Sequence, residues 1–587
     1  MKRFGPFALL GLTQILIFFN DPLHFFIADS LMWMKYRHHS VGDFLAGFLH
    51  VDPALLYRPL SQRAVESVLF PLAGLNPLPY RVVGFVLFFA CTVAVFVLAE
   101  TLTESRRIAW LTVLVFAPHL IHAFPTYDVS FTPELLFTLF CLGSAVFYVR
   151  YIRTPNRSAL TVSVALFVLG LLSKESAAAL PLALLAIWFL LPRQKRGRSW
   201  SLLPYFVILA VYLSFAVGYL HIRQLNLDNV LLGNTSSVSD YRFGKGGHIL
   251  ENIAAAFSWA FGIPSGVHGQ WSFTAQGMLT WLKALRILTC LGAICVLFTS
   301  RRNFLLLGIA WFLILASPGL PLANHFLPYY LFAPLAGFAL AAGLVFDWLY
   351  AQCAKISRTA AIVGTAILLA GWTRSHATTA NLLVINHSLL GGASRISAAT
   401  VADIQTLYPT LPAGARVVLF NEDIPSAPGD QMGGALLQLA YKDPTLVTDY
   451  VTLGFSIPAE DLNAGKVLVF KWTGDRFVDA TALARQRPDL LQAHSATTNY
   501  HLELSTAEVP AGRESYTLRV PELQNTAAVI LPAVNGRVLE PFKVDLDSRG
   551  ETRFDVPKET KGTYTFVAIR QENESAWVPV MRSIQIR

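Results

Sequence analysis

Residues 4–22 read FGPFALLGLTQILIFFNDP, an apolar run that ends abruptly at Asn20-Asp21-Pro22. A run of this length can cross a bilayer as a helix, and Pro22 cannot continue the interior of one. No small-x-small cleavage site follows, so we expect a retained first span rather than a cleaved signal. Asp21 would then stand at the membrane–water boundary, where an ionisable group is unfavourable and usually functional.

Similar apolar runs recur as far as about residue 373, in a chain that is 54% hydrophobic and 14% charged. A soluble chain carries about a quarter charged residues, so we expect a polytopic helical membrane domain over residues 1–375. The predicted spans, about eleven in all, cover residues 4–20, 80–100, 108–124, 131–149, 158–173, 177–192, 201–220, 279–299, 303–319, 328–349 and 358–373. Outer loops 21–79 and 221–277 interrupt them, and the first should carry short helices in the membrane interface.

Basic residues cluster in alternate short loops, as in Arg106-Arg107 and Arg301-Arg302. This is the positive-inside pattern, and it predicts a cytoplasmic N-terminus and a C-terminal part outside the membrane. The same loops explain the formal net charge of +9. No basic patch with interleaved aromatic residues occurs in the tail, so we expect no nucleic-acid partner.

The tail divides into an α/β region, residues 376–495, and a β-rich, sandwich-like region, residues 496–587. Ala415–Phe420 and Lys466–Phe470 are typical of buried strands, and Gly433–Tyr441 has helical spacing. Short strand-like runs separated by Gly, Pro and Asn dominate the last region; they are Tyr500–Leu504, Ala527–Leu531, Tyr564–Ile569 and Trp577–Ile586. All five cysteines lie at or before Cys353, and none has the spacing of a zinc site.

Two polar groups near the first span are candidates for chemistry. Asp21 could accept a proton from an attacking hydroxyl as a general base, or it could simply end a helix at the interface. Arg58, in YRPLS at 57–61, could hold a phosphate with its planar fork. The alternative for Arg58 is snorkelling to lipid headgroups.

Adjacent opposite charges interrupt the apolar sequence in LLSKES at 171–176. Lys174 could bind a phosphate oxygen, and Glu175 could orient Arg58 or Lys174. Neighbouring residues on a helix do not face each other, so Lys174 and Glu175 should have different partners. The alternative is a structural turn between two spans.

Further candidates are acidic or aromatic. Asp29, Asp128 and Glu134 are additional carboxylates of the predicted outer face. Glu134 falls in the first turn of a helix, where capping is more expected than catalysis. His325 could donate to phosphate or sugar oxygens, whereas for Tyr329-Tyr330 we favour an aromatic interface belt.

Four segments of the chain resemble, in their order, the motifs of the GT-C glycosyltransferases. They are FFNDP at 18–22, YRPLS at 57–61, LLSKES at 171–176 and YYLFAP at 329–334. The pattern is most similar to the protein O-mannosyltransferases, in particular the transmembrane-and-tetratricopeptide-repeat type and its bacterial relatives. The resemblance covers about residues 1–350 and does not include the repeats. Pro22 stands where many relatives have a second acid, which leaves open whether a divalent metal binds and whether Asp29 supplies that carboxylate.

The resemblance implies an enzyme of the bacterial inner membrane that moves a sugar from a polyprenyl-phosphate donor to an acceptor hydroxyl outside, with inversion. The acceptor would be a protein, a lipid or a glycan. Asp21 would be the catalytic base, and Arg58, Lys174, Glu175 and His325 would bind the donor. The alternatives are a transporter or lipid flippase, whose sites favour the bilayer midplane, and a non-catalytic membrane assembly protein.

Overall fold

The computed structural model forms two compact units. The membrane unit runs to Gly391 but omits Phe25–Lys35, and the C-terminal unit contains Gly392–Arg587 together with Phe25–Lys35. The structure describes residues 5–19, 21, 23–49, 57–191, 199–215, 247–263, 276–322, 326–386, 391–421, 424, 426–450, 461, 464–486, 503–507, 513–519, 527–534, 537–538, 542–557, 562–572 and 576–586.

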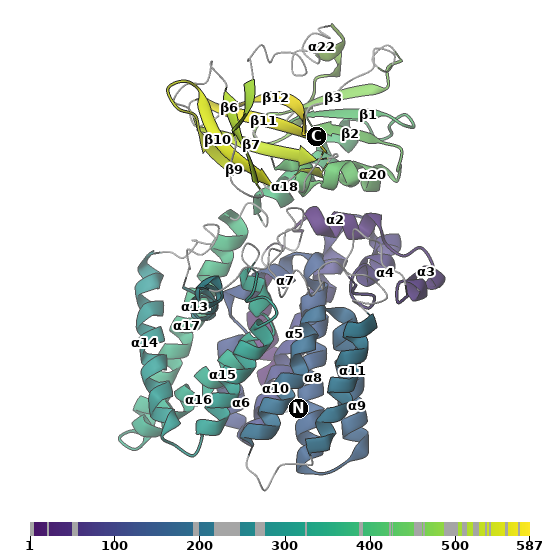
Figure 1. Ribbon diagram of the computed structural model, residues 1–587. Helices are drawn as coiled ribbons and strands as arrows, with labels where there is room; N and C mark the ends of the chain where they lie inside the picture. The colour runs from purple at the N-terminus through teal and green to yellow at the C-terminus, as the bar shows by residue number, and fades with distance from the viewer. Residues whose placement is uncertain are drawn as a thin grey trace. The chain divides into compact units, whose positions relative to one another are not determined.

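The membrane unit is built of helices, and each predicted span overlaps at least one of them (Figure 1). The helices are α1 (Gly5–Phe18), α3 (Val41–Ala46), α4 (Ala64–Ala73), α5 (Pro77–Thr103), α6 (Arg106–Phe116), α7 (Ala123–Tyr127), α8 (Thr132–Arg153), α9 (Arg157–Ser173), α10 (Leu180–Leu190), α11 (Leu203–Ser214), α13 (Gly247–Ala260), α14 (Gln276–Leu297), α15 (Arg302–Ala316), α16 (Leu335–Ala354) and α17 (Arg358–Asn386). Short 3-10 turns connect several of them: η1 (Leu120–His122), η2 (Val129–Phe131), η3 (Glu175–Ala179), η5 (Ser199–Leu202) and η9 (Pro328–Leu331).

The chain is an integral membrane protein by the length and composition of these helices. Within the described ranges, four segments are long and apolar enough to cross a bilayer: Pro77–Thr103, Val129–Arg153, Thr280–Leu297 and Leu335–Ala354. A fifth span is formed if the bent pair Arg106–Phe116 and Leu120–Tyr127 is counted as one, and shorter apolar helices accompany them. The count of about eleven spans stays a prediction.

Some predicted spans differ from the observed helices, as two of them illustrate. Residues 108–124 do not form one helix, because α6 ends at Phe116 and the chain bends by 60° before η1 and α7. Pro118 lacks the N–H that a continuous helix requires there. In contrast, α17 continues to Asn386, past the predicted end at 373, because its polar residues Ser375 and His376 are buried inside the unit.

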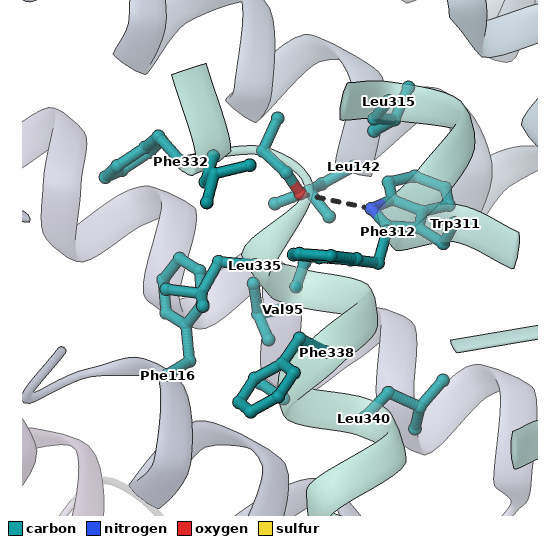
Figure 2. Close-up of a cluster of buried hydrophobic side chains, with 14 of the residues drawn as sticks. Val95, Phe116, Leu142, Trp311, Phe312, Leu315, Phe332, Leu335, Phe338 and Leu340 are labelled. Carbon is teal, nitrogen blue, oxygen red and sulfur yellow. Dashed lines mark hydrogen bonds between the residues drawn. The ribbon is translucent and has the colours of Figure 1, made fainter. Parts of the chain in front are cut away.

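The core of the membrane unit lies where α5, α6, α8, α15 and α16 meet (Figure 2). Trp311 of α15 donates from Nε1 to the carbonyl of Ala333 at 3.1 Å, surrounded by buried Leu and Phe side chains. Gly308 and Gly337 let α15 and α16 approach closely, since a Cβ on Gly308 would stand 2.7 Å from the carbonyl oxygen of Gly337. Small residues at such contacts are typical of helix packing in membranes.

A buried carboxylate of one helix pairs with arginines at the start of two others. Asp347 of α16 is inaccessible to solvent and pairs with Arg107 of α6 and with Arg301, which precedes α15. Both arginines belong to the basic loops that the sequence assigns to the cytoplasmic side. The pairing shows that these residues also have a structural role inside the unit.

We expect the double variant R107Q/R301Q to lower the free energy of unfolding by about 3–5 kcal/mol, because it leaves the Asp347 carboxylate buried without a partner. Each single variant should lose less, since one arginine remains. Thermal unfolding in detergent measures the effect, and addition of Asp347→Asn to the double variant should recover part of the loss. Equal and small losses in all variants would contradict this role of Asp347.

The C-terminal unit begins with an α/β layer. Strands β1 (Arg416–Phe420), β2 (Val447–Tyr450) and β3 (Val467–Trp472) are parallel and β4 (Phe477–Asp479) pairs antiparallel with β3, in the order β2-β1-β3-β4. Helices α18 (Ala393–Leu407), α19 (Ala427–Asp430), α20 (Ala435–Tyr441) and α22 (Thr481–Gln486) accompany the sheet. The buried strands and the helix predicted from sequence correspond to β1, β3 and α20, whereas β2, whose first residues are exposed or half-buried, lacked a clear pattern.

The remainder of this unit is antiparallel β structure, formed by two sheets with the orders β10-β6-β5 and β12-β11-β7-β8, and with β9 beside β7. The strands are β5 (Glu503–Ala507), β6 (Arg513–Arg519), β7 (Ala527–Val534), β8 (Arg537–Val538), β9 (Phe542–Asp545), β10 (Glu551–Pro557), β11 (Gly562–Glu572) and β12 (Ala576–Ile586). The predicted runs 527–531, 564–569 and 577–586 lie in β7, β11 and β12.

One helix of the C-terminal unit comes from the first outer loop. Helix α2 (Ala28–Lys35) contacts α20 and η11 (Met432–Gly434), and just before it the amide of Phe25 donates to Ser394 Oγ at 2.7 Å. Leu31, Trp33 and Met34 of α2 are buried. The sequence predicted interfacial helices in this loop, but α2 is part of the C-terminal unit.

Candidate active site

The YRPLS and LLSKES segments lie side by side in the membrane unit. Helix α9 ends because Lys174 is extended, with φ −161° and ψ 136°, which leaves the last carbonyl groups of the helix without intrahelical donors. The amide of Leu60 donates to Leu172 O at 3.1 Å, and Ser61 Oγ donates to Ser173 O at 2.5 Å. Residues 60–61 thus complete the end of α9 and bring Arg58 next to η3.

Arg58 forms a two-pronged ion pair with Glu175. Its Nε and Nη2 donate to Oε2 and Oε1 of Glu175 at 2.9 and 2.6 Å. The Arg58 side chain is 11% exposed and that of Glu175 34%, so the pair lies at the edge of the unit's interior. Glu175 takes two of the five N–H donors of a guanidinium and fixes its plane.

Lys174 has a different partner, as its adjacency to Glu175 led us to expect. Its Nζ donates to Glu134 Oε1, and both side chains are almost completely buried. The ring of Tyr330 lies 4.8 Å from Nζ on one side and that of Phe137 at 5.8 Å. Glu134 is therefore an ion-pair partner in the first turn of α8 rather than only a cap.

These four residues, Arg58, Glu175, Lys174 and Glu134, are called the ion quartet below. Two cations face two carboxylates, so their formal charges cancel. Lys174 is covered by Tyr330, whereas Arg58 lies closer to solvent. In this conformation Arg58 is the cation better placed to contact an anionic ligand.

Asp21 lies in a second group, which we call the Asp21 cluster. Arg81 of α5 donates to Phe18 O at 3.0 Å and to Thr126 O, and its guanidinium lies 4.0 Å above the ring of Tyr127. These contacts hold the end of α1 against α5 and α7, directly before Asp21.

Within the Asp21 cluster, Asp21 Oδ2 lies 3.2 Å from Nδ1 of His24. The Asp21 side chain is half-exposed and that of His24 is buried. The hydrogen bond from His24 lowers the pKa of the Asp21 carboxyl, and it prevails over the opposing effect of partial burial. The charges of His24 and Arg81 lower this pKa further, so Asp21 is ionised at neutral pH.

A row of aromatic side chains leads from η2 to the ion quartet. Tyr127 precedes Asp128 and η2, where the ring of Phe131 lies 4.7 Å from that of Tyr329. Tyr329 in turn lies 4.7 Å from Tyr330, which covers Lys174. The favoured interpretation of the two tyrosines as an interface belt does not describe Tyr330, because its ring packs against the buried ammonium group.

The remaining predicted residues have other positions. Asp128 caps η2, accepting from Ser130 N at 2.8 Å. Asp29 lies in the first turn of α2 and so belongs to the C-terminal unit. His325 lies outside the described residues. In the part of the chain that the structure describes, no three His, Cys, Asp or Glu side chains converge as metal ligands.

The structure adds residues that the sequence reasoning missed. His24 and Arg81 surround Asp21. In the sequence, His24 could have been identified by its position three residues after Asp21, and Arg81 by its position at the start of a predicted span. Glu66 of α4 is fully buried, and its carboxylate oxygens accept no hydrogen bond from the described residues. Burial raises the pKa of Glu66 to about 8, with Asp128 adding to the rise, so its carboxyl is largely protonated at pH 7.

Residues 58–220 match the family model described as dolichyl-phosphate-mannose-protein mannosyltransferase. This match confirms the predicted resemblance to a family of glycosyltransferases. The matched range contains Arg58, Asp128, Glu134, Lys174 and Glu175. No protein with a curated description matches the chain.

Among solved structures, ArnT from Cupriavidus metallidurans bound to undecaprenyl phosphate is 13% identical, with 86% of this chain and 96% of that chain covered and a TM-score of 0.47. The oligosaccharyltransferase of Archaeoglobus fulgidus in the apo form is 12% identical, with 75% of this chain and 64% of that chain covered and a TM-score of 0.42.

Proposed function

We propose that this protein transfers a single sugar from a polyprenyl-phosphate donor to an acceptor hydroxyl, on the outer side of a bacterial inner membrane. The family match of residues 58–220 is the observation that carries the proposal, and the ion quartet within that range supports it. The acceptor is a hydroxyl of a protein, a lipid or a glycan.

In the proposed reaction, Asp21 acts as the general base. Its carboxylate is ionised and half-exposed, so it can accept the proton of an acceptor hydroxyl as the oxygen attacks the anomeric carbon. The bond from that carbon to the phosphate oxygen breaks, and the polyprenyl phosphate leaves with the electron pair. Attack opposite the departing phosphate inverts the anomeric centre.

In the proposed reaction, the ion quartet stabilises the leaving phosphate. The phosphate gains negative charge as the bond breaks, and an oriented cation in a partly dry site stabilises that charge. Arg58 is the first contact, because Glu175 fixes its guanidinium at the edge of the interior. Lys174, buried behind Tyr330, adds positive potential without having to contact the phosphate.

Purified protein in liposomes tests this function. We expect radiolabelled sugar to pass from a polyprenyl-phosphate monosaccharide to a membrane acceptor fraction, and oligosaccharide carriers to be poor donors. Transfer of oligosaccharides instead would indicate an oligosaccharyltransferase or a polymer ligase. Movement of the lipid across the bilayer without any transfer would support the transporter hypothesis.

Arg58→Lys should reduce kcat/KM for the donor about 10- to 100-fold, because lysine keeps the charge but loses the fork that pairs with both Glu175 and phosphate. The effect should appear mainly in the KM for the donor. Arg63→Lys is a matched control, since Arg63 belongs to the same loop and donates to the backbone of Tyr36. Unchanged kinetics in Arg58→Lys would contradict a phosphate contact.

A further inference from the structure

His24 lies directly behind the carboxylate that we propose as the base. Its amide donates to Asp21 O at 3.3 Å, which closes a turn, and its Nδ1 lies 3.2 Å from Asp21 Oδ2. The His24 side chain is 2% exposed and that of Asp21 49%. The imidazole is thus enclosed by protein, while the carboxylate that it contacts is half-exposed.

The surroundings hold the imidazole in place. The centroids of the His24 and Tyr127 rings lie 5.2 Å apart, and the two ring planes make an angle of 83°. Arg81 of α5 covers Tyr127, and its carbonyl contacts hold Phe18 and Thr126. Among the described residues, the titratable groups that act on Asp21 or are acted on by it are His24, Arg81 and Tyr127.

We propose that His24 is a positioning residue for Asp21, holding one carboxylate oxygen so that the carboxylate is presented to the acceptor hydroxyl. The inference rests on the proposed function of Asp21 as the base. It goes beyond that function because it assigns to a buried histidine the orientation and proton affinity of the base. Nδ1 must carry the proton, and His24 itself takes no proton from the acceptor.

The sign of the pH effect follows from the hydrogen bond. Donation from His24 lowers the pKa of Asp21, so the ionised base persists to lower pH. Without that donor the pKa of Asp21 rises toward its usual value. The acidic limb of the pH profile of kcat should then move to higher pH. At pH values well above that limb Asp21 is ionised in any case, so kcat should fall there only because the carboxylate is less well oriented.

Two substitutions of similar polarity distinguish a role of His24 in positioning Asp21 from a role in merely filling space. Asparagine places an amide N–H near the position of Nδ1, whereas glutamine places its amide near the position of Nε2. We expect His24→Gln to lower kcat about tenfold and to move the acidic limb to higher pH, with little change in KM. His24→Asn should restore most of both properties. His39→Leu is a control, because His39 is exposed in the same loop.

Several outcomes would overturn the proposal. Equal losses in His24→Asn and His24→Gln without a shifted limb would mean that His24 only fills space. Wild-type kinetics in both variants would mean that Asp21 needs no support. If neither variant folds, as judged by thermal unfolding in detergent, His24 is a structural residue.

Asp21→Asn distinguishes failure of this inference from failure of the proposed function. If Asp21→Asn transfers sugar normally, the assignment of the base is wrong, whatever His24 does. If Asp21→Asn is inactive and His24→Gln is normal, only the role of His24 is wrong. In the double variant, His24→Gln should have no further effect on residual activity, because the carboxylate that it positions is already absent.

Discussion

Asp21→Asn should lower kcat for sugar transfer at least about a hundredfold, because a positioned general base contributes about 10²–10⁴ to the rate. Asparagine has nearly the same shape as aspartate and can still accept a hydrogen bond from His24. The variant should therefore insert and unfold like the wild type, and its donor KM should change little. Transfer of labelled sugar in liposomes, normalised to folded protein, measures the loss.

Asp43→Asn is the matched control. Asp43 is an exposed carboxylate in the same loop, in the first turn of α3, and we expect its substitution to leave the rate within about twofold, as is usual for surface positions that bind nothing. Full transfer by Asp21→Asn would remove the base from the proposed mechanism. Loss of transfer in both variants would indicate that the loop as a whole, rather than Asp21, is required.

Lys174→Met should have the second large effect, and this one includes stability. Removal of the ammonium group leaves the Glu134 carboxylate buried without its partner, a change that lowers the free energy of unfolding by about 3–5 kcal/mol. Transfer should also fall, because the positive potential behind Arg58 is lost. Thermal unfolding in detergent and transfer per folded molecule separate the two effects.

The double variant Lys174→Met/Glu134→Gln decides between structure and chemistry. It contains no buried unpaired charge, so most of the lost stability should return. We expect transfer to remain low. If stability and transfer both return, the Lys174–Glu134 pair serves only as the structural turn between two helices, which was the alternative interpretation of LLSKES.

Much of the site could be predicted, because ionisable residues are conspicuous in apolar sequence. YRPLS and LLSKES were both identified as candidate segments, and the structure joins them through Leu60, Ser61 and Arg58. The separate partners of Lys174 and Glu175 followed from their adjacency. In both cases a local feature of the sequence, either a charge within an apolar run or the spacing of residues on a helix, agreed with the contacts in the structure.

The identities of most partners could not be predicted from the sequence. Glu134 lies 40 residues before Lys174, and nothing in either segment specifies that the two meet. Tyr330 has the composition of an interfacial aromatic residue, and only packing reveals that it covers an ammonium group. The bend after α6 shows a related limit, because an apolar pattern continues across Pro118 even though the helix does not.

The position of α2 in the C-terminal unit has a consequence for how the chain is made. Lys35 leaves the ribosome 400 residues before Ala435, the first residue of α20, against which α2 packs. At about 5–20 residues per second, this interval is about 20–80 s. Throughout that time Leu31, Trp33 and Met34 lack their final neighbours. The C-terminal unit can therefore be completed only when α2, synthesised early, packs against α20, synthesised late. A fragment that starts at Gly392 would lack α2, which is one of the helices of this unit.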